Sequence, residues 1–418
     1  IFLLPLQTVW IARELFVHGQ KLQYGTLFFP LIELFVLLVV FISFKWNNIK
    51  NWKYYWPIYL FFLYGLIRSA FALEPLVALQ QLRFLLFPFV LFFFFKKARE
   101  YVSVQKILAA LISSSVLISV FAIGQFFLQT SFSSSFLGIT EHAPALAGSS
   151  VVVSTGERWL RSYGVFSHPN MFGGYLLVTL GISLLWFFIY KTRTKQFRVF
   201  LNAAIYIQFF ALLTTFSRSA WIGLVVVVGI FLWMFQKNYF PYLRQIGTVI
   251  LNMLLIAILF TSFFPNAVGV RLFGGSQNEV ASTSERLDGY SQAFEVLQAY
   301  PLFGTGAGNY TFALANLFPN YPVWAYQPVH NTDLLFFAEW GIIGGILFLF
   351  LLLHYRKPIF GQNDRVIVLG LAIFLIPGLV DHYLLSSYPG LLFIGLFIAI
   401  FPSFLRENEV STELSTKA

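Results

Sequence analysis

Apolar residues follow one another in long runs along this chain, and short polar or charged stretches separate the runs. A helix that crosses the hydrocarbon core of a bilayer needs about 20 mostly apolar residues. The pattern therefore predicts an all-α polytopic membrane protein. About twelve transmembrane helices are expected, at residues 1–17, 27–44, 55–73, 77–95, 106–128, 168–190, 199–217, 219–236, 245–264, 331–353, 366–383 and 388–404. The first of these segments contains Arg13 and Glu14, and the fourth contains Gln80, Gln81 and Arg83.

The composition agrees with this interpretation. Hydrophobic residues make up 58% of the 418 residues and charged residues only 11%, whereas a soluble domain carries about 25% charged residues. The partner of such a surface is the lipid bilayer. Cysteine is absent, which excludes disulfides and thiolate metal sites. The net charge of +10 does not indicate a nucleic-acid partner, because Lys and Arg collect in the cytoplasmic loops of membrane proteins.

Basic residues predict the orientation of the spans. If the chain starts inside, 18 of the 27 Lys and Arg residues fall in the cytoplasmic segments 45–54, 96–106, 191–198, 237–244, 354–365 and 405–418. This distribution follows the positive-inside rule. It predicts a single transmembrane domain over residues 1–418 with both ends in the cytoplasm. An outer loop is expected at 129–167, and a large periplasmic loop at 265–330 between the ninth and tenth helices.

Lys and Arg are distributed differently between the two sides. The cytoplasmic segments hold eleven Lys and seven Arg, and the remaining positions hold one Lys and eight Arg. The planar guanidinium binds phosphate through two hydrogen bonds, so the outer arginines are a candidate anion site. Snorkelling to the interface is the alternative. Arg68 and Arg218 fit snorkelling least, because they lie at or within apolar spans, whereas Arg83 should tolerate Lys if it only snorkels.

The large loop contains a helical pattern, whereas loop 129–167 is rich in Ser, Ala and Gly and shows little sign of a core. Ser282 and Glu285 have the spacing of a capping box. Apolar residues then recur at helical spacing, at Leu287, Tyr290, Phe294 and Leu297. A surface helix is therefore predicted at 283–299. A Gly-rich run, Gly304 to Gly308, follows it and is expected to be flexible.

Five short motifs occur in order in the second half of the chain: FSHPNMFGGYL from Phe166, FSRSAW from Phe216, YPLFGTGAGNY from Tyr300, HNTDLLFFAEWGIIG from His330, and DHYLL from Asp381. In the fourth, nine residues separate His330-Asn331 from Gly341 and Gly344. Together with the large loop between spans nine and ten, these motifs resemble the O-antigen ligase and polymerase superfamily. The resemblance is closest to the O-antigen ligase family.

This resemblance implies a C-type (GT-C) glycosyltransferase-like fold in the bacterial inner membrane, with the active site on the periplasmic face. Such enzymes use neither a metal nor another cofactor. The implied donor is a glycan linked to undecaprenyl diphosphate. The implied acceptor is another glycan, the lipid A core or a protein hydroxyl.

The candidate residues suit glycosyl transfer from a diphosphate. The reaction needs a base for the acceptor hydroxyl, and an imidazole accepts a proton near neutral pH, so His330 is the candidate catalytic residue. Arg218 and Arg286 are expected to bind the pyrophosphate. Asn331, His168 and Asp381 complete the candidate substrate-binding set.

Some of these residues could have purely structural roles instead. His168 could cap its span together with Asn170, and Asp381 with His382 could form a structural pair with an arginine. The outer loops contain no Asp-x-Asp pair, so no metal site is predicted.

Three other functions remain open. A polymerase or a protein O-oligosaccharyltransferase of the same superfamily would share this plan. A transporter or flippase for an anionic lipid or sugar would also place Arg within the membrane, but it predicts internal repeats and broken helices around a midplane site. No clear repeat is present, and the candidate residues gather at the outer ends of spans. A purely structural membrane protein gives no reason for the Arg bias.

Overall fold

The structure is a computed structural model. It describes residues 2–43, 52–98, 101–154, 156–189, 194–235, 240–274, 277–360, 372–374 and 376–399. Most of these residues are helical, and six helices are long and apolar enough to cross a membrane: Pro75–Phe95, Val104–Leu128, Pro169–Phe188, Lys195–Thr214, Arg244–Phe263 and Thr332–Tyr355. Two further apolar helices, Arg218–Trp233 and Tyr388–Ala399, are shorter. The chain is therefore a mostly helical, multi-pass membrane protein.

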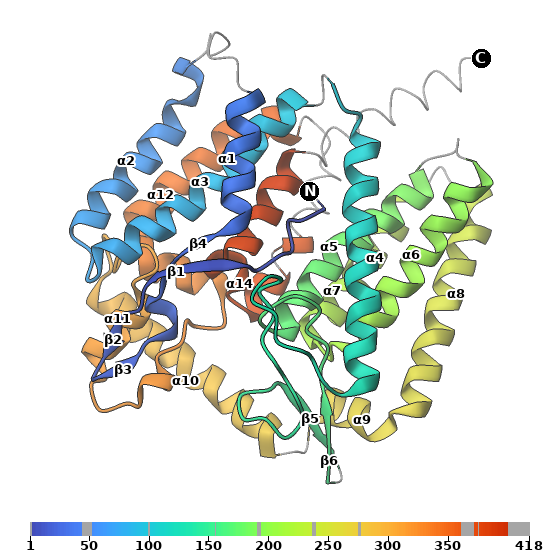
Figure 1. Ribbon diagram of the computed structural model, residues 1–418. Coiled ribbons are helices and arrows are strands. Elements are labelled where there is room, and N and C mark those ends of the chain that lie inside the picture. The colour runs from blue at the N-terminus through green and yellow to red at the C-terminus, as the bar shows by residue number, and fades with distance from the viewer. Residues whose placement is uncertain are drawn as a thin grey trace.

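The long helices form two groups (Figure 1). One group contains α1 (Leu31–Ser43), α2 (Trp56–Ala70), α3 (Pro75–Ala98) and α12 (Thr332–Phe360). The other contains α4 (Val104–Leu128), α5 (Pro169–Ile189), α6 (Lys195–Thr214), α7 (Arg218–Phe235) and α8 (Phe240–Phe263). The short helix α14 (Tyr383–Ser386) lies between the groups. These helices occupy the predicted spans from the second to the tenth, except that residues 27–30 form a strand.

The helix α5 is the most buried element of the second group, and α4, α6 and α7 pack around it. Small residues near its start let other elements approach. A Cβ at Gly173 would press on Ser217, and a Cβ at Gly174 would collide with the ring of Tyr383 in α14. Small residues at helix contacts are typical of membrane proteins, where close van der Waals packing replaces the hydrophobic effect. The glycine pair thus brings α14, and with it Asp381, against the start of α5.

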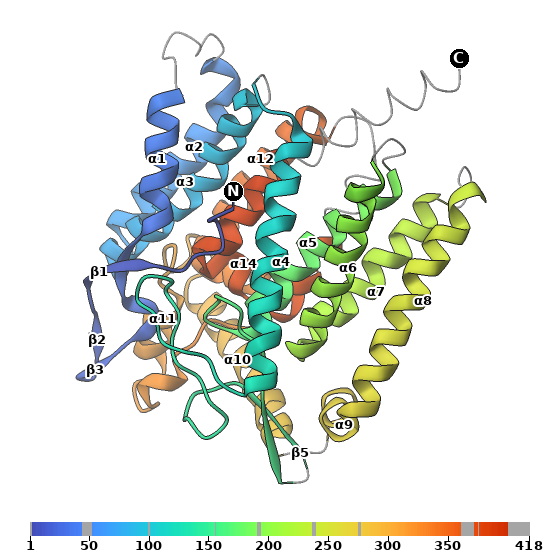
Figure 2. The same ribbon diagram turned by 45° about the vertical axis from the view of Figure 1, so that its right-hand side comes forward.

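Both expected outer loops lie on the same side of the bundle, which we call the loop side (Figure 2). The first loop contains the antiparallel strands β5 (Val151–Ser154) and β6 (Glu157–Leu160). The second contains α9 (Pro265–Phe273), α10 (Gln277–Ala299) and α11 (Tyr310–Leu317). The helix α10 covers residues 283–299, where the sequence predicts a surface helix. It already begins at Gln277, so the predicted capping box at Ser282 is wrong.

The first predicted span, residues 1–17, is also wrong. Strands β1 (Val9–Arg13) and β4 (Leu27–Pro30) pair, and between them β2 (Phe16–Val17) pairs with β3 (Gln20–Lys21). The Thr8 hydroxyl donates to the carbonyl of Phe136 at 2.5 Å, and the ring of His18 lies near that of Tyr326. These contacts hold the segment on the loop side, because Phe136 and Tyr326 belong to the two loops.

Some predictions fall on residues that the structure does not describe. The eleventh span was expected at 366–383, of which residues 372–374 and 376–380 are described and helical. The helix Tyr388–Ala399 occupies most of the twelfth span. The expected cytoplasmic segment 405–418 lies outside the described residues.

Candidate functional site

The structure brings His330 and Asp381 together at the start of α12. Nδ1 of His330 lies 3.6 Å from Oδ1 of Asp381, and the rings of His330 and His382 have centroids 5.2 Å apart. The hydroxyl of Thr332 donates to the Asp381 carbonyl at 2.9 Å. Because Thr332 is the first residue of α12, this bond fixes His330 beside the break that holds Asp381 and His382.

Asn331 is the N-cap of α12. Its Oδ1 accepts a hydrogen bond from the backbone N–H of Leu334 at 2.9 Å, which is the bond that an N-cap asparagine makes. Its Nδ2 donates to the carbonyl of Leu379 at 3.1 Å. Both ends of the side-chain amide therefore hold the helix start. Asn331 therefore positions its neighbour His330. The sequence analysis instead predicts that Asn331 contacts the substrate.

A chain of buried polar groups supports the carboxylate of Asp381. Nδ2 of Asn170 donates to its Oδ2 at 2.9 Å, and the backbone N–H of His382 donates to its Oδ1 at 2.8 Å. Arg161 in turn donates through Nη2 to Oδ1 of Asn170 at 2.6 Å and through Nε to the carbonyl of Thr215 at 2.7 Å. Arg161, Asn170 and Asp381 are all buried. A buried anion is stable only with such partners, and the amide of Asn170 links it to a buried cation.

The charges at this site follow from burial and from these contacts. Asp381 and His382 lie in the break between two helices, outside the apolar spans. Burial raises the pKa of Asp381, but the contact with His330 and the electrostatic interactions with the imidazoles of His382, His330 and His168 outweigh it and hold the pKa below its ordinary value. Burial lowers the pKa of His382 to about 4, against the attraction of Asp381. Asp381 is thus an anion at neutral pH, and His382 is a neutral imidazole.

His168 lies at the start of α5, near the same groups. Its Nδ1 accepts the backbone N–H of Asn170 at 3.1 Å, and its Nε2 lies 3.2 Å from the Ser150 hydroxyl. Burial, followed by the nearby charge of Arg161, lowers the pKa of His168 to about 3. A neutral His168 therefore caps α5 and orients Asn170. This is the structural role that the sequence analysis gives as the alternative to substrate binding.

A strained turn precedes Arg218, the first residue of α7. Phe216 has a φ of 48°, a conformation that a bulky residue adopts only when its surroundings impose it. Arg271 of α9 donates to the Phe216 carbonyl through Nε at 2.9 Å and through Nη2 at 2.7 Å. The bond from Arg161 to Thr215 ties the same turn to Asn170. Arg218 is half-buried. Hydrogen bonds through Arg161 and Asn170 thus connect the turn before it to Asp381.

The remaining arginines have different surroundings. Arg286 is half-buried on α10, which packs against α12. Arg68 donates to the carbonyls of Phe303 and Gly304 at 3.1 and 2.9 Å, so it holds a loop. Arg83 does not only snorkel, because it donates to the Phe28 carbonyl at 2.6 Å and lies 3.5 Å from the carboxylate of Glu33.

The Gly-rich run fills a break in α12. Gly341 has a φ of 65° and a ψ of −176°, which interrupts the helix. Two backbone hydrogen bonds of 2.9 Å join the run to this break, from Thr305 to Ala338 and from Gly306 to Glu339. Two more join the break to the residues just before the run, from Ile342 to Pro301 at 3.0 Å and from Ile343 to Leu302 at 3.1 Å. The buried carboxylate of Glu339 also accepts the N–H groups of Gly308 and Tyr310. The run that the sequence suggests is flexible is therefore bonded along much of its length.

His330, Asp381 and His382 also form a cluster with the donor atoms of a metal site. One ligand atom from each lies within 4.8 Å of the others. The sequence offers little warning of this cluster, because His330 and Asp381 belong to separate motifs on either side of α12.

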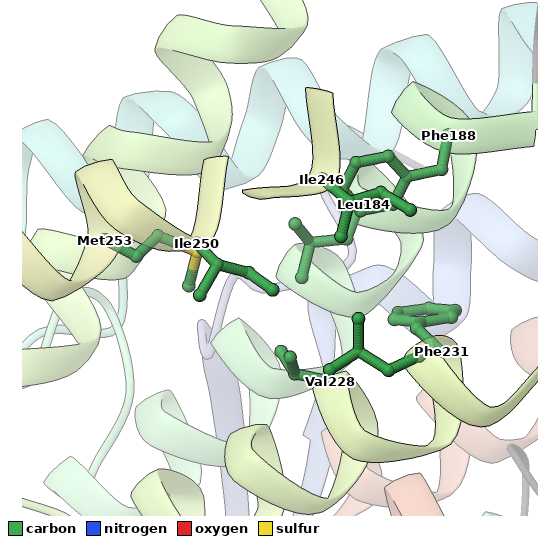
Figure 3. A pocket seen from close by; sticks show the side chains of 8 residues that line it. Leu184, Phe188, Val228, Phe231, Ile246, Ile250 and Met253 are labelled. Carbon is green, nitrogen blue, oxygen red and sulfur yellow. The ribbon is translucent and has the colours of Figure 1, made fainter. Parts of the chain in front are cut away.

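A pocket between α5, α7 and α8 (Figure 3) has no chemical groups of this kind. It is lined only by apolar side chains: Leu184, Phe188, Val228, Phe231, Leu232, Ile246, Ile250 and Met253. None of them can accept a proton or bind a phosphate, so this pocket is not the candidate site.

Comparison with known families finds a match over part of the chain. Residues 203–349 match a family model described as O-antigen ligase. This range contains Arg218, Arg286 and His330, whereas His168 and Asp381 lie outside it. No curated protein matches the chain. The family match confirms the resemblance that the motifs indicate.

Proposed function

We propose that this chain, whose residues 203–349 carry an O-antigen ligase domain, transfers a glycan from undecaprenyl diphosphate to an acceptor hydroxyl. The loop side would then face the periplasm of a bacterial cell, across the inner membrane, in a GT-C-like arrangement of helices. One observation carries the proposal: His330, inside the matched domain, contacts the buried carboxylate of Asp381 at 3.6 Å. This is the pair that a base-assisted transfer needs.

In this mechanism His330 removes the proton from the acceptor hydroxyl. The acceptor oxygen forms a bond to the anomeric carbon of the donor sugar, and the bond from that carbon to the diphosphate breaks. The carboxylate of Asp381 orients the imidazole and stabilises the imidazolium that results. The leaving group is undecaprenyl diphosphate, which takes the electron pair of the broken bond.

Arg218 and Arg286 would stabilise the charge that develops on this leaving group. A guanidinium binds two phosphate oxygens at once, and its effect is larger in a partly desolvated site than in water. The turn before Arg218 is fixed by Arg161 and Arg271, so its backbone is organised before substrate arrives. Arginine would thus take the place of a divalent cation, and the transfer would be metal-independent.

The acceptor distinguishes a ligase from its relatives. An O-antigen polymerase would use a growing glycan, and a protein O-oligosaccharyltransferase would use a Ser or Thr hydroxyl. A transporter for an anionic lipid or sugar is the candidate from another class, and the break in α12 is a feature that it predicts. In this chain, however, backbone groups of the Gly-rich run already bond to the break, which leaves fewer of its groups for an ion or a substrate.

Transfer of a purified lipid-linked glycan to a panel of acceptors tests the proposal. Replacing His330 by Ala should lower the rate by about 10²-fold or more, because it removes the base. Arg218→Lys keeps the charge but loses the fork, and should cost at least about tenfold, or about 1.4 kcal/mol. Arg13→Lys, at an exposed position, is the control and should change little. Near-normal transfer by folded His330→Ala and Arg218→Lys variants would contradict the proposal.

Metal independence needs a separate measurement. Transfer should continue in EDTA, because the proposed leaving-group stabilisation comes from arginine. Loss of transfer in EDTA, with recovery on adding Mg²⁺ or Mn²⁺, would show that a cation does this work instead.

A further inference from the structure

We propose that His330, Asp381 and His382 bind a divalent transition-metal ion such as Zn²⁺, and that the bound ion inhibits transfer. The inhibition rests on the proposed function, in which His330 is the base. The binding itself does not, because it depends only on the three side chains.

The ligand types and their spacing suit zinc. Zinc binds imidazole nitrogen and carboxylate oxygen at about 2.0–2.2 Å in a tetrahedron, which places ligand atoms about 3.3–3.6 Å apart. Nδ1 of His330 and Oδ1 of Asp381 are 3.6 Å apart, and all three ligand atoms lie within 4.8 Å of one another. Small side-chain rotations, of about 1 Å at the ligand atoms, would therefore complete the set.

Hydrogen bonds prepare His382 as a ligand. The hydroxyl of Ser386 donates its hydrogen to the His382 carbonyl at 3.1 Å, and its oxygen lies 2.6 Å from Nδ1 of His382. In the tautomer that we propose binds the ion, the hydroxyl hydrogen stays on the carbonyl, and Nδ1 carries the proton and donates it to the Ser386 oxygen. Nε2 of His382 then has a free lone pair. Metal-binding histidines are usually fixed in this way through their second nitrogen.

His330 would supply the other imidazole ligand, through its Nδ1. Its Nδ1 is buried and has no hydrogen-bond partner among the residues that the structure describes, because 3.6 Å to Asp381 is too long for one. The side chain as a whole is 30% exposed, so the ring borders solvent, and an ion would reach Nδ1 through the small side-chain rotation that binding requires. Two imidazoles and one carboxylate leave the fourth tetrahedral position for water, as in an open zinc site.

The network around Asp381 limits the affinity and explains the inhibition. Arg161 lies one amide away from Asp381, through Asn170, and its positive charge opposes a second cation. We therefore expect reversible binding, weaker than that of a structural zinc site. A bound ion would occupy Nδ1 of His330, neutralise Asp381 and place positive charge beside the base. An imidazole in that environment cannot take a proton from an acceptor.

The test uses the full chain, purified without a histidine tag and freed of metal with a chelator that is then removed. Co²⁺ serves as the probe, because its visible absorption reports tetrahedral coordination, and Zn²⁺ titration calorimetry gives the affinity. We expect one ion per chain. His382→Ala should lower the affinity at least tenfold, and Ser386→Ala should lower it several-fold by freeing Nδ1. His18→Asn removes an exposed histidine at a positive φ that Asn tolerates, and should bind like the wild type.

Activity gives the second readout. Zn²⁺ should inhibit wild-type transfer, and EDTA should restore it. Absence of the tetrahedral Co²⁺ spectrum, or equal affinity in wild type and in folded His382→Ala and Ser386→Ala variants, would overturn the metal site and leave the proposed function untouched. Stimulation of transfer by the ion would overturn the inhibitory role. Failure of the metal-free protein to transfer any glycan would count against the proposed function alone.

Discussion

Arg161 shows how one residue can connect two parts of the site. It bonds to Thr215 in the turn before α7 and to Asn170 at the start of α5. Lys has no fork that could reach both acceptors. We predict that Arg161→Lys lowers the free energy of unfolding by about 1.5–3 kcal/mol, the usual effect of losing a hydrogen bond from a buried charged group.

Thermal unfolding in detergent measures this effect. Arg158→Lys is the matched control, because Arg158 is exposed and donates to the Pro144 carbonyl at 2.8 Å from the protein surface. It should change stability by less than about 0.5 kcal/mol. Equal melting temperatures for the two variants would show that the fork of Arg161 is dispensable.

His168 makes stability depend on pH. Burial and the charge of Arg161 lower its pKa to about 3 in the folded chain, against about 6.5 in an unfolded one. Between these values the unfolded chain binds a proton that the folded chain excludes, so stability falls as pH falls. The loss is at most about 1.4 kcal/mol per pH unit.

His168→Asn should reduce this dependence, because Asn can still cap α5 but does not titrate. The measurement compares melting temperatures near pH 7 and near pH 5. The drop should be larger for the wild type than for the variant. An equal drop in both would mean that the pKa of His168 is the same in the folded and the unfolded chain, and it would contradict the prediction.

Sequence motifs identify His330 and Asp381, but they could not reveal the residues between them. Asn170 is visible as part of a His-Pro-Asn element, yet its bond to Asp381 joins residues 211 positions apart. Arg161 and Arg271 are two of several outer arginines in the sequence, and nothing in their local pattern separates them from Arg158. Their roles depend on carbonyls that the strained turn at Phe216 exposes. Only the fold creates those acceptors.

At the scale of elements, the helix α12 and the Gly-rich run form one unit. Gly341 breaks the helix at a positive φ, and a Cβ there would collide with the carbonyl of Leu302. Gly341→Ala should therefore lower stability by more than about 2 kcal/mol, through backbone strain and the clash together. Gly229→Ala in α7, where a Cβ meets nothing within 4 Å, is the matched control. Thermal unfolding should separate the two, and similar stability would mean that the run moves aside easily.

The N-terminal strands show where hydrophobic length misleads. Residues 1–17 are apolar enough to suggest a span, but Arg13 and Glu14 interrupt them, and Glu14 pairs with Lys21 at 2.5 Å. A turn at His18 and Gly19, both with positive φ, then reverses the chain. Apolar side chains such as Trp10 and Phe16 remain exposed on these strands. Amphipathic aromatic residues suit a membrane interface, so apolar content alone does not distinguish a strand there from a span.

At the scale of the whole molecule, the site lies where the two helix groups meet. His330 lies two residues before α12 of the first group, Asn170 lies in the first turn of α5 of the second, and Asp381 lies two residues before α14. Figure 1 shows α14 between the two groups. Tyr24 of the N-terminal segment adds an edge contact to the ring of His382. The sequence predicts the helices from periodicity and length, but their grouping depends on packing between distant segments, which a single sequence does not show.

The orientation of the molecule decides whether its substrate can reach this site. Ser103 and Ser135 are exposed and lie beyond opposite ends of α4. This helix has 25 residues, so it is about 37 Å long and can cross a bilayer. Lys96, Lys97 and Lys106 are close to Ser103 in the sequence, so the positive-inside rule predicts that this end faces the cytoplasm. The chain has no cysteine, and single Ser103→Cys and Ser135→Cys variants can therefore be labelled without background. An impermeant maleimide added to intact cells should label Ser135→Cys and should reach Ser103→Cys only after permeabilisation.

The reverse pattern would put His330 on the cytoplasmic face, where a donor presented in the periplasm could not meet it. Labelling of both variants in intact cells would mean that α4 does not cross the membrane.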